Sequence, residues 1–97
     1  MLQLTITTPT KVVFDGTVTI VTVPGNNGSF QIMNNHAPIV SSLIEGKVIF
    51  FASDSIQISK ETSDELTPVD TKKNTYQFFT KGGILELSDN KITILSE

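Results

Sequence analysis

The sequence predicts a single all-β domain, and three observations carry that prediction. Apolar and polar residues alternate along most of the chain, which is the pattern of strands buried on one face. Pairs of turn-forming residues, such as Asp15-Gly16 and Asp89-Asn90, recur at short intervals. No long segment has the helical period. A chain of 97 residues can bury roughly two-thirds of its unfolded surface, so we expect one core in a compact sandwich or barrel.

The first two strands are predicted from residues 2–7 and from the segment TVTIVTV at residues 17–23. The apolar side chains of LQLTIT, residues 2–7, all fall on one face. The second segment carries apolar side chains on both faces, with Val18 and Ile20 on one and Val21 and Val23 on the other. This change of phase indicates a β-bulge or a strand that is buried on both faces.

A third strand, GSFQIM at residues 28–33, follows the turn sequence PGNNG. Strict alternation directs Phe30 and Ile32 toward the core and leaves Gln31 and Met33 outward. An exposed methionine suits a contact with a partner, because its thioether adapts to irregular surfaces. A strand with both faces partly covered by the protein itself fits the same pattern.

The segment APIVSSLIEG, residues 37–46, is the one ambiguous element. It could form a short helical turn, but its apolar residues suit a buried strand better. These residues are Ile39, Val40, Leu43 and Ile44.

Two hairpins can be tested by their register. A two-residue turn at Asp89-Asn90 pairs Leu87 with Ile92 and Leu85 with Ile94, so all four apolar side chains share one face. A turn at Ser53-Asp54 likewise pairs Phe51 with Ile56 and Ile49 with Ile58. A slip of one residue in either register would expose half of these side chains.

Residues 61–75, ETSDELTPVDTKKNT, interrupt this rhythm because they are polar and charged. A stretch of this composition cannot bury much apolar surface, so we expect a mobile loop. The loop interrupts but does not divide the fold, and residues 1–97 are expected to form one domain.

The composition excludes several classes of function. The chain has no cysteine, which rules out disulfides, thiolate nucleophiles and iron–sulfur clusters. Its lysines are scattered, arginine is absent and the net charge is −3, so nucleic-acid binding is not expected. The first residues do not form a signal peptide, and the longest wholly apolar run, VIFFA, is far shorter than a membrane span of about 18 residues. We expect no direct membrane insertion.

His36, the single histidine, lies in the sequence NNHAP. A general base needs an orienting partner and a zinc site needs several ligands, yet the nearest carboxylate in the sequence is Glu45. No G-x-S-x-G motif is present, and PGNNG lacks the lysine and helix of a phosphate-binding loop. We therefore expect no catalytic residue, no metal and no cofactor, and interpret His36 as a side chain that packs at a surface or interface.

Two segments, VVFDGTVTIVTVPGNNGSFQIMNNHAPIVSSLIEGKV and GGILELSDNKITILSE, resemble the epsilon subunit of the bacterial F-type ATP synthase. The chloroplast form is similar, and the mitochondrial counterpart is called delta. The residues in step with the family signature are Phe14, Gly16, Val18, Val21, Pro24, Gly25, Gly28, Phe30, Ile32, His36, Ala37, Pro38, Gly82, Gly83, Glu86, Asn90, Thr93 and Leu95. Gln31 replaces the usual glycine, and Asn34-Asn35 replaces the usual Pro-Gly but remains a turn-forming pair.

The resemblance implies a ten-stranded antiparallel β-sandwich that serves as a non-catalytic rotor subunit of the central stalk. It implies the gamma subunit and the c-ring as direct partners, with the alpha and beta subunits of F1 reached indirectly. The subunit would couple proton translocation to ATP synthesis from a peripheral position at the cytoplasmic face of the bacterial inner membrane.

Carried over position by position, the resemblance implies two contact surfaces. The c-ring-side residues are Asn26, Asn27, Gly28, Ser29, Phe30 and Gln31. The gamma-side residues are His36, Pro38, Ser41, Met33 and Thr8.

Typical members of the family continue into two C-terminal helices, whereas this sequence stops at Glu97. We expect a short form without the helical hairpin, with a piece of a longer protein as the other reading. Two other functions stay open. A freestanding β-sandwich interaction or adhesion module predicts a signal peptide or a fusion partner, and a small hydrolase needs a second polar cluster close to His36.

Overall fold

The structure, a computed structural model, describes residues 2–52, 66–69 and 74–97. Within these ranges the chain is all-β, as predicted, and forms nine strands rather than the expected ten. The strands are β1 (Leu2–Thr7), β2 (Val12–Gly25), β3 (Gly28–Met33), β4 (Ile39–Leu43), β5 (Gly46–Ala52), β6 (Leu66–Pro68), β7 (Thr75–Thr80), β8 (Gly83–Ser88) and β9 (Lys91–Ser96).

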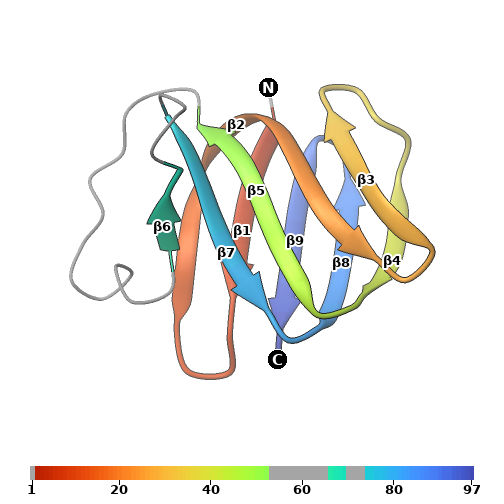
Figure 1. Ribbon diagram of the computed structural model, residues 1–97. Helices are drawn as coiled ribbons and strands as arrows, with labels where there is room; N and C mark the ends of the chain where they lie inside the picture. The colour runs from red at the N-terminus through yellow and green to blue at the C-terminus, as the bar shows by residue number, and fades with distance from the viewer. Residues whose placement is uncertain (1, 53–65, 70–73) are drawn as a thin grey trace.

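The long strand β2 belongs to both layers of the sandwich (Figure 1). Its first half, up to Val18, pairs antiparallel with β1, and its second half, from Ile20 to Gly25, pairs antiparallel with β3. One layer therefore contains β3, β2, β5, β7 and β6, and the other contains β4, β8, β9, β1 and the start of β2.

A β-bulge in β2 accounts for the change of phase seen in the sequence. The register between β2 and β5 shifts between Val18 and Ile20, so an extra residue is accommodated there. Val18, Val21 and Val23 are consequently all buried, although their positions differ in parity. Of the two predicted alternatives, the bulge is confirmed.

The first and last strands lie side by side and run parallel. Gln3 pairs with Lys91 and Thr7 with Leu95, and the other edge of β1 is antiparallel to β2. The expectation of an entirely antiparallel sandwich is therefore wrong at this one pairing. The parallel pairing arises because β9 starts at the Asp89-Asn90 turn, beside the start of β1. There the Gln3 N–H donates to the Asn90 carbonyl at 2.9 Å.

The predicted hairpin at Asp89-Asn90 is confirmed in its register. Leu87 pairs with Ile92 and Leu85 with Ile94, and all four side chains are buried. Asp89 and Asn90 have φ angles of 50° and 61°, the left-handed backbone that a tight type I′ turn requires at both central positions.

The hairpin predicted at Ser53-Asp54 is wrong. Its proposed partners Ile56 and Ile58 lie outside the described residues, and both edges of β5 are already occupied. Ile49 pairs with Thr22 of β2 and with Gln77 of β7, and Phe51 pairs with Ile20 and Thr75. The turn residues were compatible with a hairpin, but β7 supplies the partner strand instead.

The single loop expected at residues 61–75 also differs from the structure. Residues 61–65 and 70–73 lie outside the described part of the chain, but β6 interrupts the stretch. Leu66 of β6 is buried and pairs with Phe78, and Pro68 pairs with Tyr76. Leu66 is the one large apolar residue of that polar segment, and its burial explains the short strand.

Residues 39–43 form a strand, as favoured, but only part of the expected burial is found. Leu43 is buried and Ile39 is partly buried against the core, whereas Val40 is 75% exposed and Ile44 is 48% exposed. The strand alternates between a core face and an outer face, so its apolar residues are divided between the two.

Aromatic rings connect three strands inside the sandwich. The ring of Phe50 lies 4.5 Å from that of Phe14 and 5.9 Å from that of Tyr76, measured between centroids. Every described strand adds apolar side chains around these rings, including β3, which contributes Ile32 and the partly buried Phe30. Dense interiors of this kind have low compressibility, so the domain is expected to be stiff.

We expect the core to respond very differently from the surface to truncation of adjacent residues on β9. Ile94 is fully buried and Leu95 is 54% exposed. Ile94→Ala should lower the free energy of unfolding by about 2–5 kcal/mol, because it leaves a cavity, whereas Leu95→Ala should cost about 1 kcal/mol or less. Urea denaturation followed by circular dichroism measures both, and equal losses would contradict the two-layered core.

Candidate functional site

The β2–β3 hairpin holds all six of the proposed c-ring-side residues in one continuous segment. Asn26 and Asn27 connect Gly25 to Gly28, which face each other as a strand pair. Gly28 has a φ of 119°, a conformation that side-chain-bearing residues rarely adopt. A Cβ on Gly25 would lie only 2.6 Å from the ring of Phe30, so the missing side chain lets that ring fold over the turn.

Two backbone hydrogen bonds fasten this hairpin to β4. Asn26 N–H donates to the Ser42 carbonyl at 3.1 Å, and Ile44 N–H donates to the Pro24 carbonyl at 2.9 Å. They flank the single pairing of β2 with β4, between Gly25 and Leu43. The tip of the hairpin is thus held against the second layer.

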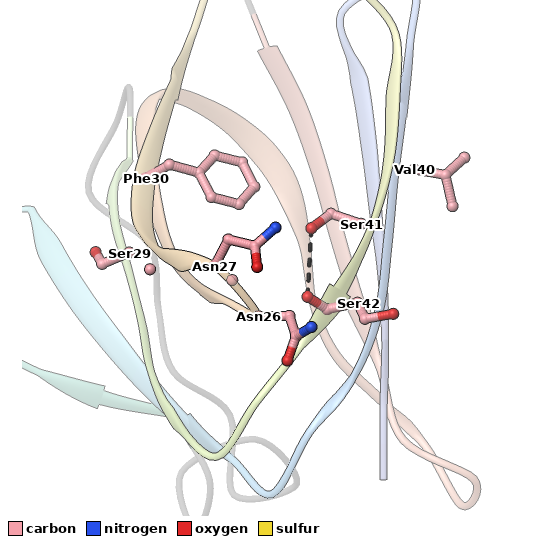
Figure 2. A pocket seen from close by; sticks show the side chains of 9 residues that line it. Asn26, Asn27, Ser29, Phe30, Val40, Ser41 and Ser42 are labelled. Atoms are coloured by element: carbon pink, nitrogen blue, oxygen red, sulfur yellow. Dashed lines mark hydrogen bonds between the residues drawn. The ribbon is translucent and has the colours of Figure 1, made fainter.

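A groove of about 510 Å³ lies between the hairpin and β4. Figure 2 shows the side chains of Phe30, Asn27 and Ser41 facing the space between β3 and β4, while Val40 points away from it. The Ser41 hydroxyl donates to the Ser42 carbonyl at 3.3 Å. The residues that line the groove carry amides, hydroxyls and one aromatic ring but no charge.

Exposure of the c-ring-side residues follows the alternation predicted for this strand. Asn26, Asn27, Gly28, Ser29 and Gln31 are exposed, and Phe30 is partly buried. Ile32 is buried and Met33 is 51% exposed, so the predicted faces of residues 28–33 are confirmed.

His36 lies in the connection between β3 and β4, at the end of β3 opposite the hairpin tip. It is exposed, and its bonds involve backbone only: its N–H donates to the Met33 carbonyl at 3.3 Å, and ring Nδ1 donates to the Ala37 carbonyl at 2.7 Å. Within the described residues, the hydrogen bond of the imidazole goes to a backbone carbonyl and not to an acid or a nucleophile. This arrangement leaves the second ring nitrogen for an external partner.

A pair of asparagines joins the His36 connection to the β8–β9 turn. Asn35 N–H donates to the Asn90 side-chain oxygen at 2.8 Å, and the Asn90 amide donates to the Asn35 side-chain oxygen at 3.3 Å. Asn35 has a φ of 67°. The two turns are therefore fixed to each other through side chains that also tolerate left-handed backbone.

The structure brings together only part of the proposed gamma-side set. Met33, His36 and Pro38 lie close in sequence around one connection, whereas Ser41 faces the groove with the hairpin residues. Thr8 lies in the β1–β2 turn, where its N–H donates to the Lys11 carbonyl at 2.9 Å. The length of β1 separates Thr8 from the Asn90 turn. Thr8 is therefore about 16 Å from the asparagine pair, measured along the strand.

The structure shows two exposed apolar clusters that were not predicted from the sequence. On the outer face of β4, β8 and β9, Ile84 pairs with Leu95, and Val40 is on the neighbouring strand. All three are at least half exposed. The sequence did contain a signal for this cluster. Side chains alternate along a strand, so Ile84 must point outward when Leu85 and Leu87 point inward.

The second cluster crosses the outer face of the other layer. Ile20 pairs with Met33 on one side and with Phe51 on the other, and Phe51 is 41% exposed. The same alternation that confirmed Met33 as outward could have placed Ile20 beside it.

Across residues 2–52, 66–69 and 74–97 we find no helical segment with the length and hydropathy of a membrane span.

The fold defines a β-sandwich domain whose surface carries a polar groove, an anchored hairpin and two apolar patches. The family model for the ATP synthase delta/epsilon chain β-sandwich domain matches residues 1–97, and the chain belongs to this family.

Relatives agree with that assignment along nearly the whole chain. The ATP synthase epsilon chain of Chlorobium limicola is 38% identical over 95 residues, which are 98% of this chain and 88% of the relative. The epsilon chain of Chlorobaculum tepidum is 35% identical over 94 residues, or 97% of this chain and 86% of the relative.

A solved structure has the same fold. It is a chain in the central stalk and c-ring of the Tetrahymena thermophila mitochondrial ATP synthase, with a TM-score of 0.68 and 21% identity. The match covers 98% of this chain and 62% of the solved one.

We expect Asn90→Gly to release the His36 connection without unfolding the β8–β9 turn. Glycine keeps the left-handed backbone at position 90 but removes both bonds to Asn35. Amide hydrogen exchange at Asn35 should accelerate by about tenfold, the effect of losing one hydrogen bond. The amides of Ile92 and Ile94 serve as internal controls, and unchanged exchange at Asn35 would show that the asparagine pair does not hold the turn.

Proposed function

We propose that this chain is the epsilon-type rotor subunit of an F-type ATP synthase, linking the gamma subunit to the c-ring. The proposal is supported by family membership over residues 1–97 and by relatives named ATP synthase epsilon chain. Such a chain is non-catalytic: it contributes contacts and stiffness, and the chemistry of ATP synthesis takes place elsewhere in the complex. Through its partners it would reach the alpha and beta subunits of F1 indirectly.

The observation that carries the mechanism is the position of the two proposed surfaces at the two ends of β3. The hairpin at Asn26–Gln31 begins the strand, and Met33 and His36 follow its end. A strand of this length spans roughly 20 Å, and it is bonded to β2 along its whole length. Torque applied at one end would be delivered at the other with little deformation.

In this arrangement the hairpin faces the c-ring and the connection from Met33 to Pro38 faces gamma. Ser41 would extend the gamma contact along β4, and Thr8 would require a second, separate contact. The chain would sit peripherally, at the cytoplasmic face of a bacterial inner membrane, while proton translocation turns the ring. The combined interfaces should reach the standard size of about 1,600 Å².

The test is purification of the tagged full chain from its native membranes. We expect the gamma and c subunits to be retained with the wild type. Ser29→Lys should reduce retention of the c-ring by about tenfold, because it places a charge in an uncharged contact, and His36→Ala should similarly reduce retention of gamma. Both variants should lower proton-driven ATP synthesis in membrane vesicles.

Lys47→Ala is the matched control, since Lys47 is exposed on β5 and belongs to neither surface. Recovery of the chain without gamma and c subunits would refute the function. Normal retention and coupling in both site variants would refute only the assignment of the contacts.

A further inference from the structure

The groove of Figure 2 is bordered by two strand edges that lack partners along most of their length. β3 pairs with β2 alone, and β4 pairs with β8 but meets β2 only at Leu43. The two edges belong to different layers and converge at the hairpin, where Asn26 N–H donates to Ser42. Away from the hairpin, no described residue lies between them as a strand.

The free backbone groups on β3 can be identified from the ladder. Pro24 has no N–H, so its pairing with Ser29 is the non-bonded kind, and the bonded pairs of the antiparallel ladder are Val23 with Phe30 and Val21 with Ile32. Ser29 and Gln31 therefore direct their N–H and C=O groups to the outer edge.

The same reasoning applies to β4. The Ser42 carbonyl and the Ile44 N–H both point toward β2. Backbone groups alternate between the two sides of a strand, so the N–H and C=O groups of every even-numbered residue of β4 point away from β8. Val40 accordingly presents its N–H and C=O to the groove side, and Val40 and Ser29 both line the groove.

These edges lack the usual protection against pairing. Natural edge strands carry charges, prolines or bulges, or are very short. No Asp, Glu, Lys or Arg occurs between Asp15 and Glu45, and neither β3 nor β4 contains a proline. By contrast β6, at the far edge of the same layer as β3, is three residues long and ends in Pro68. One edge is blocked, and the groove edges are open.

We infer that an extended, uncharged segment of a partner protein binds in this groove as an added β-strand, bonded to Ser29 and Gln31 on one side and to Val40 on the other. The inference rests on the proposed function, because hairpin residues and Ser41 belong to its contact surfaces. Apolar side chains of the segment would pack against Phe30, and amide or hydroxyl groups would meet Asn27 and Ser41. A charged side chain would be buried without a counter-ion, which is unfavourable.

The two facing edges determine the kind of occupant. A segment between them needs both of its own edges free, as in a terminal tail or an isolated loop strand. The β3 of a second copy already has one edge bonded to its own β2, so it could satisfy only one side of the groove. Main-chain pairing of this kind supplies affinity without charge.

The test compares amide hydrogen exchange of the free chain with that of the chain in the purified ATP synthase complex. We expect the amides of Ser29, Gln31 and Val40 to slow by at least about tenfold on assembly. The amides of Phe30 and Ile32, already bonded to β2, should be protected in both states and serve as controls. A complex in which Ser29, Gln31 and Val40 exchange as fast as in the free chain overturns the inference and leaves the proposed function standing.

Two substitutions at one position distinguish backbone hydrogen bonds to the partner segment from a partner that only covers the surface. Gln31→Pro removes the outward N–H, whereas Gln31→Ala keeps it and removes only the side chain. Retention of the partners should be about tenfold lower for the proline variant than for the alanine variant, because both lose the side-chain contact and only proline also loses the backbone donor. Equal retention by the two variants overturns the inference. If Gln31→Pro does not fold, the exchange measurement on the wild-type complex decides.

Two further outcomes are distinguishable. A chain that enters no ATP synthase complex refutes the proposed function, and the inference falls with it. Protection of the same amides in the isolated chain, rising with concentration together with a dimer mass in sedimentation, would overturn the inference in favour of a second copy.

Discussion

The fold depends on a single strand that serves two layers. β2 pairs with β1 over its first half and with β3 over its second, and the bulge between Val18 and Ile20 lets both halves direct valines into one core. Without that extra residue, Val21 and Val23 would face solvent whenever Val18 faced the core. The bulge also determines where the β2–β3 hairpin projects, and therefore where the groove against β4 lies.

Features that depend on neighbours in sequence were predictable, and features that depend on distant pairing were not. Alternation correctly gave the faces of β1 and β3, and turn chemistry gave the register of the β8–β9 hairpin. The parallel contact of β1 with β9 and the pairing of β5 with β7 left no local signal, because a period of two reports which face is buried but not which strand lies alongside. The Ser53-Asp54 turn misled for that reason.

The candidate site divides in the same way. Its hairpin residues are consecutive in the sequence, so their proximity could be predicted without knowing the fold. The meeting of Ser41 with that hairpin, the separation of Thr8 from His36, and the unpaired edges of β3 and β4 all follow from strand order. The stretch from residue 16 to residue 44 contains no Asp, Glu, Lys or Arg. This lack of charge indicates open edges only once β3 and β4 are known to be edge strands.

The contact between β1 and β9 has a consequence for how the chain reaches its native state. Gln3 must pair with Lys91, a residue that lies far along the chain. Until β9 emerges from the ribosome, β1 is held by β2 alone, and its second edge and that of β8 stay open to wrong neighbours. Contacts so distant in sequence raise the contact order and slow folding, since a large loop must close before they form. The domain is therefore complete only once β9 has been synthesised and has paired with β1.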